Sequence, residues 1–262
     1  MATSVRLTRD INRRIGRAMH DYAMLADGDR VLVAVSGGFD SLVLAWMLDG
    51  WKKKAPISYE LRAVHVDMEP DGDAQGIAAR TIAERVRGLG LSLHILPALW
   101  RPDRQQRPSA PSDHDLCFQC ARSRRTQLFD YARLSNCNKI AFGHHRDDII
   151  ETFLLNVTCA GNISTMRPCQ ELFSGRLALI RPFAYLDKAE IEKIGQELGL
   201  EPVRSSCPLS EKTRRRDIHF LAEYIYQSIP GAKKNIFAAL GNVRRNYLLQ
   251  QSAGGYPDAN GK

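Results

Sequence analysis

The sequence predicts an α/β protein built on a doubly wound, mostly parallel sheet of five strands, with a helix before it and a helical tail after it. Short apolar runs rich in β-branched residues alternate with segments of helical periodicity, which is the order of βαβ units. The first run, 31–35, carries no charge, as expected of a strand covered on both faces. Two glycines and a helical pattern follow, so the turn between them allows a ligand to approach closely.

Four segments are expected along the chain. Residues 1–26 form a basic amphipathic helix, 27–205 the sheet domain, 206–250 a basic helical extension and 251–262 a disordered tail. The strands are expected at 31–35, 61–66, 91–96, 139–142 and 177–180. Helices are expected at 41–51, 73–88, 117–134, 149–157, 187–198, 218–229 and 236–249. The first helix either packs on the sheet with its arginines in water or contacts nucleic acid.

Composition limits the class of protein. At 262 residues and 44% hydrophobic content the chain can bury a full core, which excludes the disordered class. Its apolar runs are too short to span a membrane and its arginine-rich start lacks the apolar centre of a secretory signal, so we expect a cytoplasmic protein. The net charge of +8 favours a polyanionic partner. The six cysteines are expected to be reduced thiols or metal ligands.

The turn after the first strand has the composition of an anion-binding loop. It reads Ser-Gly-Gly-Phe-Asp-Ser, from Ser36 to Ser41. Gly37 and Gly38 allow backbone conformations that a side chain would obstruct, and either Asp40 or Ser41 can cap the following helix. Amide groups at that helix start favour an anion. The loop has neither the Gly-Lys-Ser/Thr ending of a P-loop nor the glycine spacing of a dinucleotide fingerprint.

Two further polar segments follow predicted strands. His65 ends the second strand, and the segment from Gly143 to Asp148 follows the fourth. Ligands gather at the carboxyl ends of parallel strands, so both segments are expected beside the glycine loop. A carboxylate at this edge suits magnesium on phosphate, with Asp148 the first choice and Asp147 the second. The alternative is a transition-metal cluster built from four side chains, those of His144, His145, Asp147 and Asp148.

Three cysteines have the spacing of a metal site. Cys117 and Cys120 lie one helical turn apart, and Cys207 comes just before the basic tail. A structural zinc site takes four ligands and no obvious fourth is present, whereas three thiolates suit a four-iron cluster with one open iron. Zinc and an iron–sulfur cluster both remain open from the spacing. The other cysteines have no partner spacing and are interpreted as buried or incidental thiols: Cys137, Cys159 and Cys169.

Two motifs together resemble one superfamily. The Ser-Gly-Gly-x-Asp-Ser string is similar to the pyrophosphatase loop of the ATP-pyrophosphatases. Paired with Gly-His-His-Arg-Asp-Asp-Ile-Ile-Glu-Thr, it looks like their anticodon-loop tRNA-modifying branch, which holds the tRNA(Ile)-lysidine synthetases and the tRNA 2-thiocytidine synthetases. The 2-thiocytidine synthetases carry Cys-x-x-Cys-x-Arg-x-Arg-Arg, present here from Cys117 to Arg125, and the lysidine synthetases lack these cysteines. The chain therefore resembles the 2-thiocytidine synthetases.

The resemblance implies a fold of the adenine nucleotide alpha hydrolase type, with 27–205 as the ATP-pyrophosphatase domain. It implies ATP, Mg²⁺ on Asp148, and a 4Fe-4S cluster on Cys117, Cys120 and Cys207. The catalytic residues implied are Asp40, Asp148 and the same three cysteines. The residues implied to bind ATP are Ser36, Gly37, Gly38, Asp40, Ser41, His65, Gly143, Asp147 and Asp148.

The implied activity is ATP-dependent sulfur transfer to tRNA. The C2 oxygen of an anticodon-loop cytidine is adenylated and then replaced by sulfur from a persulfide carrier or free sulfide. Two arginine groups are expected on the tRNA backbone, with a solvated face as the alternative: Arg122, Arg124, Arg125, Arg214, Arg215 and Arg216. A homodimer is expected. The other functions considered are modification of another RNA base or a small molecule, a lysidine-synthetase-like ligase, and a non-catalytic iron–sulfur sensor.

The chain departs from these relatives at two positions. Phe39 occupies the loop position where they usually have lysine, which removes a positive charge near the diphosphate. The segment around Cys207 has one cysteine where family members often have two. The sequence therefore predicts a divergent member.

Overall fold

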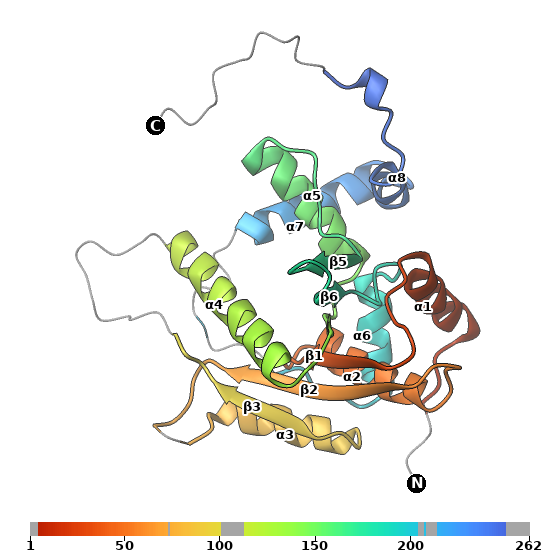
Figure 1. The fold of residues 1–262 in the computed structure, drawn as a ribbon. Coiled ribbons are helices and arrows are strands. Elements are labelled where there is room, and N and C mark those ends of the chain that lie inside the picture. The colour runs from red at the N-terminus through yellow and green to blue at the C-terminus, as the bar shows by residue number, and fades with distance from the viewer. Residues whose placement is uncertain (1–4, 73, 101–112, 204–206, 208–213, 250–262) are drawn as a thin grey trace, which may run out of the picture.

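The computed structural model describes residues 5–72, 74–100, 113–203, 207 and 214–249, and the predicted tail 251–262 lies outside them. These residues form one six-stranded sheet in the order β3-β2-β1-β4-β6-β5 (Figure 1). All pairs are parallel except β5 with β6. The strands are β1 Asp29–Ala34, β2 Tyr59–Asp67, β3 Leu93–Pro97, β4 Lys139–Ala141, β5 Cys169–Leu172 and β6 Leu177–Ile180.

The predicted α/β class is confirmed, and each of the five predicted strands is present. The sheet has one strand more than predicted, because β5 adds a sixth at one edge. The four residues of β5 read Cys-Gln-Glu-Leu and are only half buried or exposed, so they give no apolar run. A tight turn through Phe173 and Ser174, both with positive φ, returns the chain antiparallel into β6. A short polar edge strand of this kind leaves little signal in a sequence.

Most helices lie where periodicity predicts them. They are α1 Arg9–Asp21, α2 Phe39–Lys52, α3 Ile77–Gly88, α4 Asp113–Leu134, α5 Arg146–Ala160, α6 Lys188–Glu197, α7 Arg214–Ser228 and α8 Ala232–Ala239. The prediction of a helix over 236–249 is wrong, because α8 ends at Ala239 and only a short 3₁₀ turn, Arg245–Tyr247, follows. Gly241 and Asn242 close α8 with turn hydrogen bonds to the carbonyls of Ala238 and Ala239.

Successive residues of β1 pack into different layers. Val31 and Val33 join a core formed with α1, α2, α3 and α6, whereas Leu32 joins a second core that includes residues of α4. This alternation is what a strand covered on both faces requires. Helix α1 buries Ile15 and other apolar residues in the first core and leaves most of its arginines exposed, so it packs on the sheet as one of the two alternatives predicts.

The order of the strands fixes where a ligand site lies. The chain builds outward from β1 through β2 to β3, then crosses to β4 on the other side of β1. The carboxyl ends of β1 and β4 therefore flank a topological switch point, where open α/β sheets bind ligands. Helix α5 leaves β4 at this edge and packs against α7 and α8 of the C-terminal extension (Figure 1). Among the described helices, none has the length and apolar character needed to cross a membrane.

Candidate functional site

The glycine loop between β1 and α2 is shaped by a single hydroxyl group. The Oγ of Ser41 accepts hydrogen bonds from the N–H groups of Ser36 and Gly37 at 3.1 and 3.2 Å and donates to the carbonyl of Gly38 at 3.0 Å. Gly37 has a φ of +93°, and a Cβ there would lie 2.8 Å from Ile82, so the loop requires glycine at this position.

The predicted cap of α2 by Asp40 or Ser41 is wrong. The N-cap residue is Gly38, which has no side-chain cap, and the helix begins at Phe39. Asp40 and Ser41 therefore lie inside the first turn, too late to cap it, and the hydroxyl of Ser41 faces back into the loop. The first-turn N–H groups of a helix have no intrahelical acceptor, so the start of α2 retains donors for an anion.

The two predicted loops are in direct contact. A Cβ on Gly143, which follows β4, would lie 2.7 Å from the carbonyl carbon and oxygen of Asp40. Only a glycine lets the second loop pack this closely on the first.

His65, at the end of β2, lies on the other side of β1, and its Nδ1 is 2.8 Å from the carbonyl oxygen of Val35. Because a carbonyl only accepts, Nδ1 carries the proton, and burial lowers the pKa of this imidazole.

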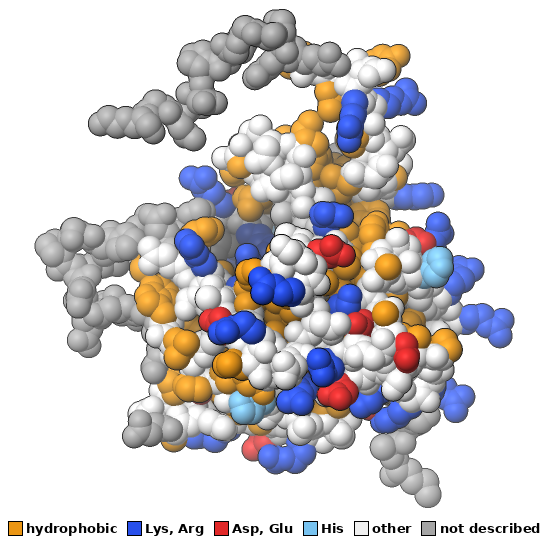
Figure 2. Space-filling model, in the orientation of Figure 1, with side chains coloured by type: hydrophobic (Ala, Val, Ile, Leu, Met, Phe, Trp, Pro, Cys, Tyr) orange, Lys and Arg blue, Asp and Glu red, His pale blue; other side chains and the backbone are white. Residues whose placement is uncertain are grey.

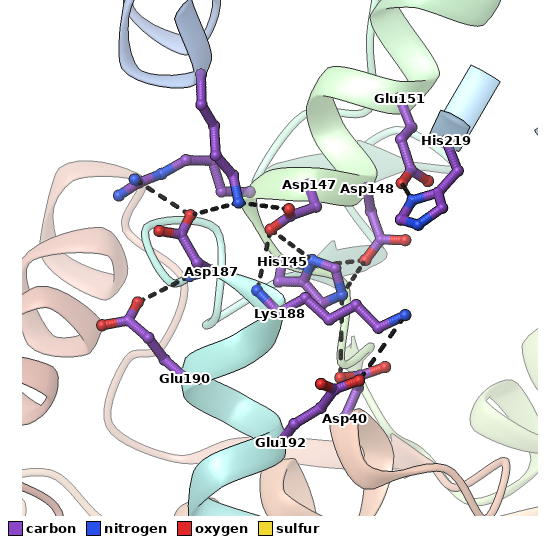
Figure 3. A network of polar contacts seen from close by, with 12 residues as sticks. Asp40, His145, Asp147, Asp148, Glu151, Asp187, Lys188, Glu190, Glu192 and His219 are labelled. Atoms are coloured by element: carbon purple, nitrogen blue, oxygen red, sulfur yellow. Dashed lines mark hydrogen bonds and ion pairs between the residues drawn. The ribbon is translucent and has the colours of Figure 1, made fainter. Parts of the chain in front are cut away.

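Three carboxylates surround the buried imidazole of His145 (Figure 3). Its Nε2 lies 3.3 Å from Asp148 Oδ2 and 3.9 Å from Asp40 Oδ1, and its Nδ1 lies 3.4 Å from Asp147 Oδ2. Burial opposes a charge on this ring, but the three carboxylates outweigh it and raise the pKa of His145. For Asp40 burial acts in the other direction and is the main reason that the pKa of this carboxyl group is raised. The sequence predicts a metal ligand at His145 only as an alternative and misses this central position.

The C-terminal extension reaches the second loop through ion pairs. Arg215 of α7 lies 3.0 Å from Asp148 Oδ1, and Lys233 of α8 lies 2.5 Å from Asp147 Oδ1. Asp147 also accepts the backbone N–H of Lys188 at 3.0 Å. Burial would raise the pKa of Asp147, but the close contacts with His145 and Lys233 outweigh it and hold that pKa well below its usual range. The carboxylate of Asp147 is thus already paired with the neighbouring cations His145 and Lys233.

The side chains of the two adjacent histidines, His144 and His145, have different partners. His144 Nδ1 accepts a hydrogen bond from Arg181 Nε at 3.2 Å, whereas His145 faces the carboxylates. Burial lowers the pKa of His144 to about 3, so this ring is neutral. Arg181 directly follows β6 and is buried. The rule that predicts His65, a polar residue at the end of a parallel strand, would also have found Arg181.

The predicted metal-binding cysteines are half buried but lie in different segments. Cys117 and Cys120 are on α4, and Cys207 precedes α7. Within the described ranges, no group of three His, Cys, Asp or Glu side chains is arranged to hold a metal ion, and this includes the three cysteines. The donor chemistry of the three thiols fits an iron–sulfur cluster. Cys137 is buried, Cys169 is half buried in β5, and Cys159 is exposed.

All six predicted RNA-binding arginines are exposed, three on α4 and three at the start of α7. Burial is the main reason that the pKa values of His65 and Arg181 are lowered, and the positive charges of Arg124 and Arg125, respectively, add to that effect. Figure 2 shows further Lys and Arg side chains spread across one face of the molecule, interspersed with carboxylates. The ion pair of Arg215 with Asp148 links the arginine group of α7 to the loop network.

The strand order reverses at β1 and β4, the glycine loop lies at this point, and the second loop packs on it. These features together are those of a PP-loop protein. Residues 7–218 match the family model described as a PP-loop domain. The tRNA-cytidine(32) 2-sulfurtransferase of Geobacter sulfurreducens is 35% identical over 244 residues, covering 92% of each chain. That of Pelobacter propionicus is 34% identical, covering 95% of this chain and 91% of that protein.

The chain therefore belongs to the tRNA 2-thiocytidine synthetase family of PP-loop enzymes, as its motifs predict. The fold agrees with a solved structure, the U34-tRNA thiolase NcsA from Methanococcus maripaludis with its [4Fe-4S] cluster. The two superpose with a TM-score of 0.68 at 22% identity, over 88% of this chain and 78% of that one. At this identity the likeness concerns the fold alone.

Proposed function

We propose that this protein uses ATP to activate an anticodon-loop cytidine of tRNA, the base at position 32 in its relatives, and exchanges the C2 oxygen for sulfur. The observation that carries the proposal is the contact between Gly143 and the backbone of Asp40. It joins the glycine loop and the carboxylate loop into one site at the switch point of the sheet. Relatives at 34–35% identity over almost the whole chain, all named for this reaction, support the substrate.

The ATP phosphates would lie on the start of α2. The loop from Ser36 to Ser41 offers first-turn amide groups there, and Gly143 lets the second loop approach closely. His65 and Arg124 would border the nucleotide on the side of β2. Bound in this way, the diphosphate is held by donors that are already in position before the reaction begins.

Magnesium would be held by Asp148, with Asp40 as its neighbour. Carboxylate oxygens are the ligands Mg²⁺ prefers, and Asp40 Oδ1 is buried without a hydrogen-bond partner in the described part of the chain. Both loop carboxylates already have partners, but Asp147 is less suited because its side chain is more deeply buried than that of Asp148 and its oxygens contact Lys233 and the N–H of Lys188. When bound, the ion would neutralise charge on the phosphates. His145 positions Asp40 and Asp148 by lying between them.

The chemistry is a double displacement at one base. The C2 oxygen of the cytidine attacks the α-phosphorus of ATP, the bond from that phosphorus to the bridging oxygen breaks, and pyrophosphate leaves. Sulfide then attacks C2, the C2–O bond breaks with AMP as the leaving group, and loss of the proton from sulfur leaves the thiocarbonyl. A persulfide carrier can be the source when a thiol reduces its S–S bond and so releases sulfide, with a disulfide as the other product. Extruding the base from a loop costs less than extruding it from a duplex.

Cys117, Cys120 and Cys207 would hold a 4Fe-4S cluster, which would supply an iron without a protein ligand as a site for sulfur. Their half-buried thiols suit the donor set, and a cluster on all three would hold the start of α4 and the segment before α7 at one place. The arginines of these two segments would then flank the tRNA backbone.

Purification without oxygen tests the cluster, with iron, sulfide and visible absorbance measured on the wild type and on Cys117→Ala, Cys120→Ala and Cys207→Ala. Each variant is expected to lose the cluster, while Cys159→Ala, at an exposed cysteine, keeps it. A colourless wild type with one tightly held zinc would overturn the cluster.

Release of AMP and pyrophosphate that depends on added tRNA tests the activation step, and Asp40→Ala should abolish this release.

A further inference from the structure

The loop position next to Asp40 is occupied by an aromatic side chain that packs on helix α6. Phe39 is half buried at the start of α2, and a methyl group on Gly195 of α6 would overlap its ring. The side chain is therefore committed to the packing of α2 on α6. Phe39 supplies no charge to the glycine loop. Its ring instead packs against α6 and holds that helix beside the loop.

This packing brings the first residue of α6 to the nucleotide edge. Ile191 and Ile194 of α6 are buried in the same core as α2, and the N–H of Lys188 donates to Asp147 of the second loop at 3.0 Å. Helix α6 is thus held at its first residue by the second loop and near its end by Phe39. In Figure 3 the side chain of Lys188 extends toward the end of the network where Asp40 lies. Its positive charge acts to lower the pKa of Asp40, against the effect of burial.

Lys188 is held more loosely than the other cations of the network. Its Nζ lies 3.9 Å from Glu192 Oε1, at the limit of an ion pair, and its side chain is 48% exposed. By contrast, Lys233 lies 2.5 Å from Asp147 and Arg215 lies 3.0 Å from Asp148. A weakly paired ammonium on a flexible stem can exchange its carboxylate for another anion at little cost.

We propose that Lys188 is a phosphate-binding residue of the ATP site, which supplies from α6 the positive charge that position 39 of the loop does not. The inference rests on the proposed function, since it assumes that the polyphosphate of ATP lies at the start of α2. The ligand chemistry is a nucleoside triphosphate, whose outer phosphates would replace Glu192 as the partner of Lys188.

The test measures binding of ATP, ADP and AMP to the full-length protein by calorimetry, without any turnover. Lys188→Met is expected to weaken ATP binding about tenfold, which corresponds to about 1.4 kcal/mol, and to leave AMP binding unchanged. Lys188→Arg keeps the charge and should stay within a few-fold of the wild type. The matched control is Lys193→Met, an exposed lysine of the same helix, which should bind ATP like the wild type.

Two further results separate the possible failures. If the wild type does not bind ATP, the proposed function fails together with this inference. If the wild type binds ATP and Lys188→Met binds it equally well, only the role of Lys188 is overturned. Glu192→Gln removes the carboxylate beside Lys188 and should not weaken ATP binding. An equal loss in this variant would show that the ion pair, rather than the charge of Lys188, supports the site, and would also overturn the inference.

Discussion

Arg215 Nη2 lies 3.0 Å from Asp148 Oδ1, so the first turn of α7 is joined to the carboxylate loop that follows β4. One partner is proposed to bind tRNA phosphate and the other magnesium. The pair thus links the two halves of the proposed site across a sequence separation of 67 residues. His219 of α7 adds a second link, with its Nδ1 2.7 Å from Glu151 Oε1.

Arg215→Ala is expected to weaken tRNA binding and to lower the dependence of log Kd on log salt by about one unit of slope. Its effect on the free energy of unfolding should stay below about 1 kcal/mol, because the arginine side chain is 47% exposed and solvent screens the pair. Filter binding across a salt series measures the slope. An unchanged slope would remove Arg215 from the RNA surface.

Lys233→Met is expected to lower the free energy of unfolding by about 2 kcal/mol, because it leaves the buried carboxylate of Asp147 without its closest cation. The pKa of Asp147 is depressed, so the stability it contributes is present above the unfolded pKa of about 4 and is lost as the pH falls below it. Chemical unfolding at pH 7 and pH 3 should show a smaller difference in the free energy of unfolding for the variant than for the wild type. Lys234→Met, at the exposed neighbouring lysine, is the control and should match the wild type.

His145→Gln is expected to remove a pH dependence of stability. The raised pKa of His145 means that its contribution is full below the unfolded pKa of about 6.5 and is lost as the pH rises through the higher folded pKa. The wild type should therefore lose unfolding free energy on going from pH 6 to pH 9, and the variant should lose less. His20→Gln changes a histidine whose side chain is 91% exposed and should retain the wild-type profile. Identical profiles for all three proteins would contradict a charged His145 among the carboxylates.

Gly143→Ala is expected to separate the two loops. Its methyl group would lie 2.7 Å from the backbone of Asp40, so either loop must move, and ATP binding should weaken about tenfold or more. Gly88→Ala, at the exposed end of α3 where a Cβ meets nothing within 4 Å, should leave ATP binding intact. Thermal unfolding of both variants shows whether the fold survives. A folded Gly143→Ala protein with wild-type ATP affinity would mean that the contact between the loops is not needed.

The sequence predicts the strands and the edge at which the loops meet because both follow from local patterns, such as the uncharged run 31–35 and the glycines after it. It does not predict the contacts that cross the fold. The position of Lys188 depends on the packing of Phe39 against Gly195, and the ion pair of Arg215 depends on α7 lying beside α5. Neither has a signature in spacing, because the partners come from distant segments. The sequence also does not predict the polar edge strand β5, because its four residues form no apolar run.

The most direct test of the central claim is the nucleoside composition of tRNA after incubation with the anaerobically purified protein, ATP, Mg²⁺ and a sulfide source. Digestion and mass spectrometry are expected to find 2-thiocytidine in the anticodon loop, with AMP and pyrophosphate formed in equal amount. Asp40→Ala should yield neither the thiolated base nor AMP. If the cluster-loaded wild type forms AMP without 2-thiocytidine, or modifies a different base, the assignment of cytidine C2 as the activated position is contradicted.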